Sequence, residues 1–153
     1  MISRVDIHQP DIAWQIYTLQ QAAYHIESQI IGYPTLPPLM ESLEDLQQSG
    51  EQFLAFQAAG QLAGVLSYTH SPNALEICRM MVSPAYFRRG IAGKLLQAVE
   101  TIEPNINQIV VSTAAQNQPA LSLYQKYGYR QTFTTTLPDG LKLVTLHKQL
   151  PYH

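Results

Sequence analysis

A short basic turn joins a predicted strand to a predicted helix in the sequence Val82-Ser83-Pro84-Ala85-Tyr86-Phe87-Arg88-Arg89-Gly90-Ile91-Ala92-Gly93-Lys94-Leu95-Leu96. The N–H groups in the first turn of a helix have no partner within the helix and carry partial positive charge. A strand that leads into such a turn therefore predicts a binding site for a phosphate group. Two glycines allow close approach of the ligand and three basic side chains add full charges, at Gly90, Gly93, Arg88, Arg89 and Lys94.

The composition of the chain limits its class. It has 153 residues, the size of one domain, and we predict a single domain over residues 1–153. The net charge of -2 argues against general nucleic-acid binding, which needs a basic excess. The single cysteine, Cys78, allows no internal disulfide and favours a reducing, cytoplasmic location. The N-terminus lacks the apolar core of a signal peptide, and no apolar run reaches membrane-spanning length.

The hydrophobic periodicity predicts alternating strands and helices. Strands are expected at 2–7, 52–57, 61–68, 75–82, 108–113, 130–136 and 141–148. Helices are expected from Pro10-Asp11 onward, as a short element that holds Leu39, Leu43 and Leu46, and at 90–102 and 117–127. This order indicates a mixed α/β (α+β) domain with a largely antiparallel N-terminal half. The step from strand 75–82 to strand 108–113 should be a right-handed parallel crossover.

A second motif covers residues 117–129, Asn-Gln-Pro-Ala-Leu-Ser-Leu-Tyr-Gln-Lys-Tyr-Gly-Tyr. Asn117 is expected to cap the helix, Pro119 to lie in its first turn and Gly128 to end it. Asn117 and Tyr124 are two turns apart on one face, so a carboxamide and a phenol should face the same groove.

Together the two motifs resemble those of the GNAT superfamily of N-acetyltransferases, which transfer acetyl from acetyl-CoA to an amine. The family's pyrophosphate loop is [QR]-x-x-G-x-[GA]; here Gly90 and Ala92 match it, and Phe87 replaces the polar residue. The second family motif, N-x-x-A-x-x-x-Y-x-x-x-G-[FY], is matched in full by Asn117, Ala120, Tyr124, Gly128 and Tyr129. The resemblance implies a mostly antiparallel twisted sheet of about seven strands, a splayed parallel strand pair and about four helices.

The resemblance also implies a cofactor site. Backbone groups near Met80 and Val82 would pair with the pantetheine arm of acetyl-CoA, and an N–H near Met80 would hold the thioester oxygen. The diphosphate would lie on the turn formed by Arg88, Arg89, Gly90, Ile91, Ala92 and Gly93, beside Lys94. Asn117 would bind the cofactor arm. Tyr124 would protonate the leaving thiolate, and no metal is expected.

The general base has several candidates. Glu76 lies six residues before Val82, an offset that resembles the Glu of histone-type members, and a partly exposed strand Glu is the plain alternative. His70 and water are the other candidate bases. Cys78 is interpreted as a small buried apolar residue, and Arg79 as a surface charge or a partner of Glu76.

The acceptor pocket of the family lies between the first helix–helix loop and the last hairpin, here residues 33–36 and 134–141. Both segments are nearly uncharged, which favours a small or partly apolar amine. A non-catalytic CoA-binding module is the alternative function. We expect a monomer or homodimer, with neither nucleic acid nor membrane as partner.

Overall fold

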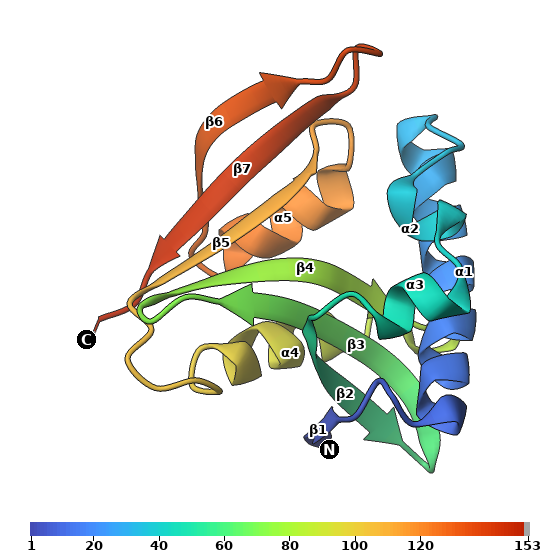
Figure 1. Cartoon of the computed structure of the whole chain (residues 1–153). Coiled ribbons are helices and arrows are strands. Elements are labelled where there is room, and N and C mark those ends of the chain that lie inside the picture. The colour runs from blue at the N-terminus through green and yellow to red at the C-terminus, as the bar shows by residue number, and fades with distance from the viewer. Residues whose placement is uncertain (152–153) are drawn as a thin grey trace.

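Seven strands form one twisted sheet in the computed structural model, which describes residues 1–151 (Figure 1). Tyr152 and His153, the end of the predicted domain, lie outside the described residues. The spatial order is β1-β2-β3-β4-β5-β7-β6, and every neighbouring pair is antiparallel except β4 and β5. The strands are β1 Ile2–Val5, β2 Gln52–Ala58, β3 Gln61–His70, β4 Ala74–Val82, β5 Gln108–Ala114, β6 Arg130–Thr136 and β7 Lys142–Gln149.

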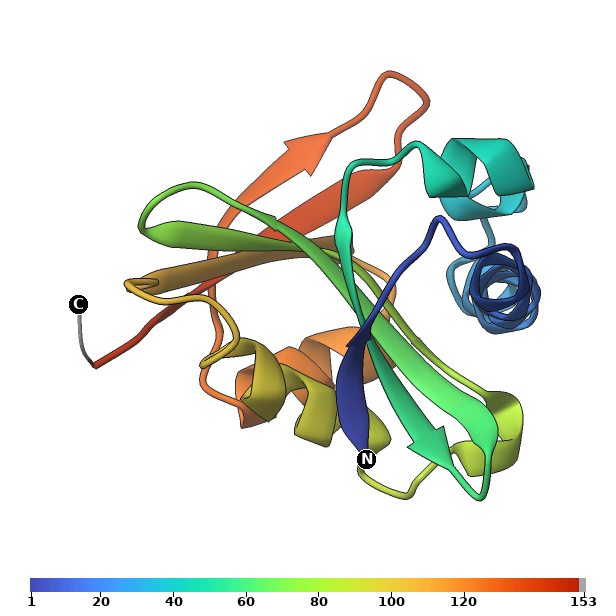
Figure 2. The same cartoon turned by 60° about the horizontal axis from the view of Figure 1, so that its bottom comes forward.

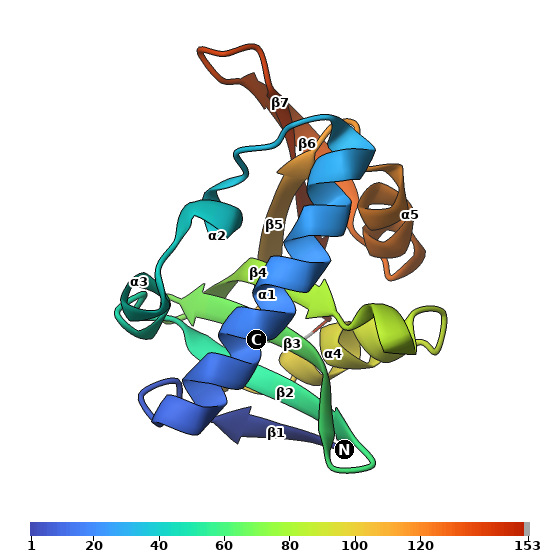
Figure 3. The same ribbon diagram turned by 90° about the vertical axis from the view of Figure 1, so that its right-hand side faces the viewer.

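Helices cover both faces of the sheet. One face carries α1, with α2 and α3 beside it, and the other carries α4 and α5 (Figures 2 and 3). Each face has its own core: Ile16 and Leu46 belong to the first, and Leu95 and Leu121 to the second. The helices are α1 Pro10–Ile31, α2 Pro37–Met40, α3 Leu43–Gln47, α4 Ile91–Val99 and α5 Gln118–Lys126, with a 3-10 turn at Pro84–Tyr86.

The parallel strands β4 and β5 separate along their length. They pair only from Ala74 with Gln108 to Ile77 with Val111. Beyond that point β4 continues beside β3 as far as Val82, while β5 continues beside β7 (Figure 1). The predicted splayed strand pair is therefore confirmed, and a stretch of β4 faces a gap in the sheet.

A β-bulge in β4 lies where the strands begin to part. Ser67 of β3 pairs with Arg79 and Tyr68 pairs with Ile77, so Cys78 has no partner in the register. Because of the extra residue, the side chains that follow it in β4 face the opposite side of the sheet from the one that simple alternation would give them. Ile77 packs in the core beneath α4 and α5, whereas Met81 packs in the core beneath α1. The interpretation of Cys78 as buried is wrong because the bulge leaves this residue exposed.

The short helical segment before β2 differs from the single helix that we predicted. Glu41 at the end of α2 has an extended backbone, and Ser42 starts a new helix. The Ser42 hydroxyl accepts a hydrogen bond from the Asp45 N–H, and the Asp45 carboxylate accepts one from the Ser42 N–H. This capping box satisfies both N–H groups and sets a local helix start that apolar periodicity does not reveal.

Candidate active site

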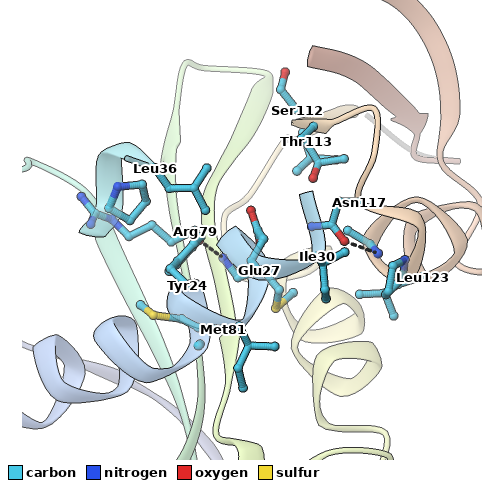
Figure 4. A pocket seen from close by; sticks show the side chains of 18 of the residues that line it. Tyr24, Glu27, Ile30, Leu36, Arg79, Met81, Ser112, Thr113, Asn117 and Leu123 are labelled. Atoms are coloured by element: carbon cyan, nitrogen blue, oxygen red, sulfur yellow. Dashed lines mark hydrogen bonds between the residues drawn. The ribbon is translucent and has the colours of Figure 1, made fainter. Parts of the chain in front are cut away.

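A cavity of about 430 Å³ lies where β4 and β5 separate, between α1 and α5 (Figure 4). Figure 4 labels Tyr24, Glu27 and Ile30 of α1 together with Met81 of β4 and Asn117, the residue that caps α5, and all five line the cavity. Most of the lining is apolar. Among the described residues, the charged side chains of this lining are Glu27 and Arg79.

The wall formed by β4 presents backbone groups that no neighbouring strand uses. The Met80 N–H donates to the Tyr24 hydroxyl at 3.4 Å, and the Ser83 N–H donates to a carbonyl of the β3 side, that of Ala63. Successive N–H groups of a strand point to opposite edges, so the Val82 N–H faces the same gap as that of Met80. The two backbone positions predicted to meet a cofactor arm thus border the gap.

The opposite wall is the helix α5, and its predicted cap is confirmed. The Asn117 side-chain oxygen accepts a hydrogen bond from the Ala120 N–H at 3.2 Å. Tyr124 lies two turns further along, is 4% exposed and meets Tyr129 edge-on with ring centroids 5.6 Å apart. Burial, and to a lesser degree the charge of Glu27, raises the pKa of the Tyr124 hydroxyl. Asn117 and Tyr124 both line the cavity, as their shared helix face predicts.

The basic turn lies at the end of the cavity, where Phe87 and Ala92 belong to the lining. Arg88 and Gly90 both have positive φ angles, 65° and 75°, so the turn is tightly curved just before α4. Such alternation of backbone conformation directs N–H groups toward one point, as in anion-binding nests. The basic side chains are exposed: Arg88, Arg89 and Lys94.

Gly93 has a packing role that the sequence does not show. A Cβ atom at this position would lie 1.9 Å from the Tyr127 hydroxyl oxygen. The absent side chain therefore lets α4 and α5 approach each other through the Tyr127 ring. Ile91 is likewise buried in the core, so the turn is held in place by the packing of the helix that follows it.

The two candidate bases from the sequence lie outside the cavity lining. Glu76 is exposed on β4, where it pairs in register with Thr69 and Val110. His70 lies at the end of β3 with its Nε2 3.6 Å from a carboxylate oxygen of Glu103. Neither is brought together with Tyr124, and the role of Glu76 stays a prediction.

Two polar residues of α1 were missed by the sequence interpretation, Tyr24 and Glu27. Both line the cavity, one helical turn apart. Burial raises the pKa of the Glu27 carboxyl, and a side-chain hydrogen bond from Asn117 partly opposes that rise. Burial, with the charge of Glu27 second, also raises the pKa of the Tyr24 hydroxyl. The sequence does carry one signal for Glu27: it is a charged residue on the helix face that holds Ile16, Leu19 and Ile31.

Arg79 is neither a surface charge nor a partner of Glu76. It is 6% exposed, and its guanidinium is bound by two carboxylates, Glu41 after α2 and Glu51 before β2. The Gln20 side chain of α1 accepts a further hydrogen bond from it at 2.9 Å. This network joins β4, next to Met80, to α1 and to the chain on either side of α3.

The two segments predicted to wall an acceptor pocket do meet. The Tyr33 hydroxyl, after α1, donates a short hydrogen bond to the Asp139 carboxylate in the β6–β7 turn. Leu36 from the first segment and Leu137 and Leu141 from the second line the cavity. These three leucines give this part of the cavity apolar walls beside Tyr33.

The parallel strands β4 and β5 separate, a basic turn precedes α4, and Asn117 and Tyr124 on α5 face the gap. Comparison with known proteins shows which family shares this arrangement. The sequence profile described as "Acetyltransferase (GNAT) domain" matches residues 23–150. The chain belongs to this GNAT acetyltransferase family.

A curated relative, UPF0157 protein YqkA of Bacillus subtilis (strain 168), is 38% identical over 147 residues. The match covers 96% of this chain and 43% of that protein, so the chain spans less than half of the relative's length.

Solved structures of acetyltransferases share the fold at low sequence identity. The ribosomal-protein-S18-alanine N-acetyltransferase from Escherichia coli has a TM-score of 0.77 at 15% identity, over 100% of this chain and 96% of that one. An aminoglycoside 6'-N-acetyltransferase complexed with coenzyme A has a TM-score of 0.77 at 14% identity, over 100% and 99%. A GNAT family acetyltransferase from Elizabethkingia anophelis with acetyl-CoA bound has a TM-score of 0.75 at 20% identity, over 98% and 97%.

The described residues hold no helix long and apolar enough to cross a membrane. Within residues 1–151 no three His, Cys, Asp or Glu side chains gather as a metal site would require.

Proposed function

We propose that this domain transfers acetyl from acetyl-CoA to a small amine, by direct transfer while both substrates are bound. The observation that carries the proposal is the gap between β4 and β5, bordered by the Met80 backbone on one side and by Asn117 and Tyr124 on the other. An extended amide chain that enters this gap can pair with β4 as an added strand.

The predicted cofactor contacts are compatible with the geometry. The pantetheine arm would pair with backbone groups of Met80 and Val82, and the thioester oxygen would replace the Tyr24 hydroxyl in its long 3.4 Å contact with the Met80 N–H. The diphosphate would lie on the N–H groups from Arg88 to Gly93, a turn whose backbone is already curved. Since these contacts use N–H groups, Phe87 in place of a polar residue need not prevent binding.

Tyr124 is the proposed acid. The neutral amine nitrogen attacks the thioester carbonyl carbon, the C–S bond breaks, and the sulfur takes the Tyr124 proton. The nitrogen releases a proton as the amide forms, and the Tyr124 phenolate regains one through solvent. A raised pKa keeps the hydroxyl protonated at neutral pH, as an acid must be, and the same burial makes a nearby thiolate more basic. The Met80 N–H would stabilise the negative charge on the carbonyl oxygen during attack.

We also propose that the domain works in the cytoplasm, as a monomer or homodimer, without nucleic-acid or membrane partners. The single cysteine supports the location, and the low net charge supports the absence of a nucleic-acid partner.

The test is acetyl-CoA turnover over a panel of alkylamines, polyamines, aminoglycosides, amino acids and protein N-termini, with calorimetry for acetyl-CoA. An enzyme should bind acetyl-CoA and release CoA in proportion to acetylated amine. Tight binding with no turnover by any amine would instead support a CoA-binding module. Absence of both binding and thermal stabilisation by acetyl-CoA would refute the CoA site itself, because a ligand at 100 times its Kd should stabilise by about 2.7 kcal/mol.

A further inference from the structure

One charge in the cavity lacks a counter-ion among the described residues. The ion pairs within residues 1–151 do not include Glu27, whereas Arg79, the other charged residue of the lining, is bound by Glu41 and Glu51. The net charge presented to a bound molecule is therefore negative. Removing a carboxylate from water costs free energy unless a cation or hydrogen bonds stabilise its charge, or the group becomes protonated.

The position of Glu27 fits contact with an acceptor amine. The Asn117 side-chain oxygen accepts a hydrogen bond from the Ala120 N–H, so it is the Asn117 side-chain NH2 group that donates to the Glu27 carboxylate. The charge of Glu27 also acts on the hydroxyls of Tyr24 and Tyr124. Glu27 thus shares the cavity with Asn117, the cap of α5, and with Tyr24, whose hydroxyl contacts the Met80 N–H (Figure 4). Tyr124, the proposed acid, lines the same cavity.

The remainder of this end of the cavity restricts what the amine can carry. Its walls include apolar side chains from α1, the following loop and the last hairpin: Ile26, Ile30, Leu36, Leu137 and Leu141. Because the Arg79 guanidinium is already bound by two carboxylates, it is not available to pair with an anionic substituent. An amine with an apolar body and no carboxylate or phosphate matches these walls.

We propose that Glu27 binds the ammonium group of the acceptor and takes its proton, and that the acceptor is a small apolar amine without an anionic group. This inference rests on the proposed acetyl transfer. The ammonium gives one proton to the Glu27 carboxylate, which passes it to solvent, and the neutral nitrogen attacks. As the amide forms, the C–S bond breaks and Tyr124 protonates the departing sulfur. The second proton of the nitrogen is transferred through solvent to the Tyr124 phenolate, so one proton is released overall.

The chemistry needs such a base near neutral pH. An alkylamine with a pKa of about 10.4 has only about one molecule in 2,500 neutral at pH 7. Burial raises the pKa of Glu27 above that of an ordinary carboxyl, which makes it a better proton acceptor. The other titratable or charged groups that line the cavity are Tyr24, Tyr33, Cys78, Arg79 and Tyr124.

The substrate class is tested with a matched pair, n-hexylamine and 6-aminohexanoate, which differ by a carboxylate at the far end. Wild-type kcat/KM should be at least about 10-fold higher for hexylamine, as expected when a buried anion finds no partner. Equal kcat/KM for the two compounds would overturn the assignment of the substrate class.

The role of Glu27 is tested with Glu27→Gln, a change of one atom that keeps the side-chain shape. We expect kcat/KM for hexylamine at pH 7 to fall at least about 100-fold, as for loss of a general base, with acetyl-CoA affinity unchanged. When kcat/KM is measured as a function of pH, the wild-type value should level off above the pKa of the Glu27 carboxyl. The value for Glu27→Gln should keep rising up to the pKa of the amine. A merely structural Glu27 would leave the two profiles parallel.

Two further carboxylates serve as comparisons. Glu44→Gln changes an exposed residue of α3 outside the cavity lining and should keep wild-type rates and pH dependence. Glu76→Gln tests the candidate from the sequence. If Glu76→Gln loses the pH-dependent step and Glu27→Gln keeps it, the role assigned to Glu27 is wrong.

Calorimetry of hexylamine with the CoA-saturated protein separates this inference from the proposed function. If the wild type binds hexylamine at pH 7 and Glu27→Gln does not, the ammonium site is supported even where no acetyl transfer occurs. Absence of acetyl transfer would refute only the proposed enzymatic function. Equal binding by both proteins, or by neither, would overturn the ammonium site.

Discussion

Replacing Arg79 by methionine should destabilise the protein strongly. The Arg79 side chain is 6% exposed and neutralises Glu41 and Glu51, whose side chains are 26% and 13% exposed. Methionine fills similar apolar space but leaves two nearby carboxylates without a cation. Removing one partner of a buried ion pair costs about 3–5 kcal/mol, and since both carboxylates keep some contact with water we expect about 3 kcal/mol.

Chemical and thermal unfolding both measure this loss. For a chain of this length, about 3 kcal/mol corresponds to a decrease in Tm of roughly 6–12 °C. Arg130→Met, at an exposed arginine of β6, is the matched control and should change the free energy of unfolding by less than about 0.5 kcal/mol.

A triple variant tests the cause of the loss. Arg79→Met combined with Glu41→Gln and Glu51→Gln removes the whole set of charges, and should recover at least half of the lost free energy because no buried charge is left uncompensated. If Arg79→Met loses less than about 1 kcal/mol, or if the triple variant is no more stable than the single one, the network does not stabilise the cavity wall as argued.

Three further substitutions follow from local contacts. Gly93→Ala should gain about 1 kcal/mol from helix propensity but lose about 1–3 kcal/mol because the new methyl group overpacks against Tyr127. Thermal melting should therefore show a net loss of stability, which a second substitution, Tyr127→Leu, should partly restore. Asn117→Ala removes the acceptor for the Ala120 N–H and should cost about 1 kcal/mol, much of which Asn117→Ser retains; equal losses would argue against the cap. Because the pKa of Glu27 is raised in the folded state, its ionised form opposes folding as pH rises through that pKa; Glu27→Gln should melt higher than wild type at pH 8, with the difference vanishing near pH 4.

Much of the architecture could be predicted because it follows from local patterns. The cap at Asn117 and the glycine that ends α5 lie at fixed offsets from an apolar stripe, and both are confirmed. The parallel crossover from β4 through α4 to β5 follows from strand order alone, and the GNAT motifs supplied the separation of the two strands.

The site could be predicted only where a motif marked it. Tyr124 and Asn117 share one helix, so spacing brings them together. Glu27 reaches the same cavity from a helix about 90 residues earlier, and no spacing rule relates it to Asn117. The environment of Cys78 depends on a bulge relative to β3, which inverts the face of β4 without any mark in the sequence of β4 itself.

Long-range pairing also explains the misinterpretation of Arg79. Alternation in a strand assigns it a face, but its burial depends on carboxylates from two other segments, Glu41 and Glu51. A charged residue in a strand is ordinarily taken as exposed unless a partner is known.

Tyr124 is proposed to supply the proton to the departing sulfur of acetyl-CoA. The most direct test is to compare kcat and the acetyl-CoA Kd of wild type and Tyr124→Phe, with the best amine of the panel and with calorimetry for the cofactor. With Tyr124 as the acid, kcat should fall at least about 100-fold while the acetyl-CoA Kd changes less than about two-fold. Unchanged kcat, or equal losses in kcat and in acetyl-CoA affinity, would contradict it and leave Tyr124 as a packing residue of α5.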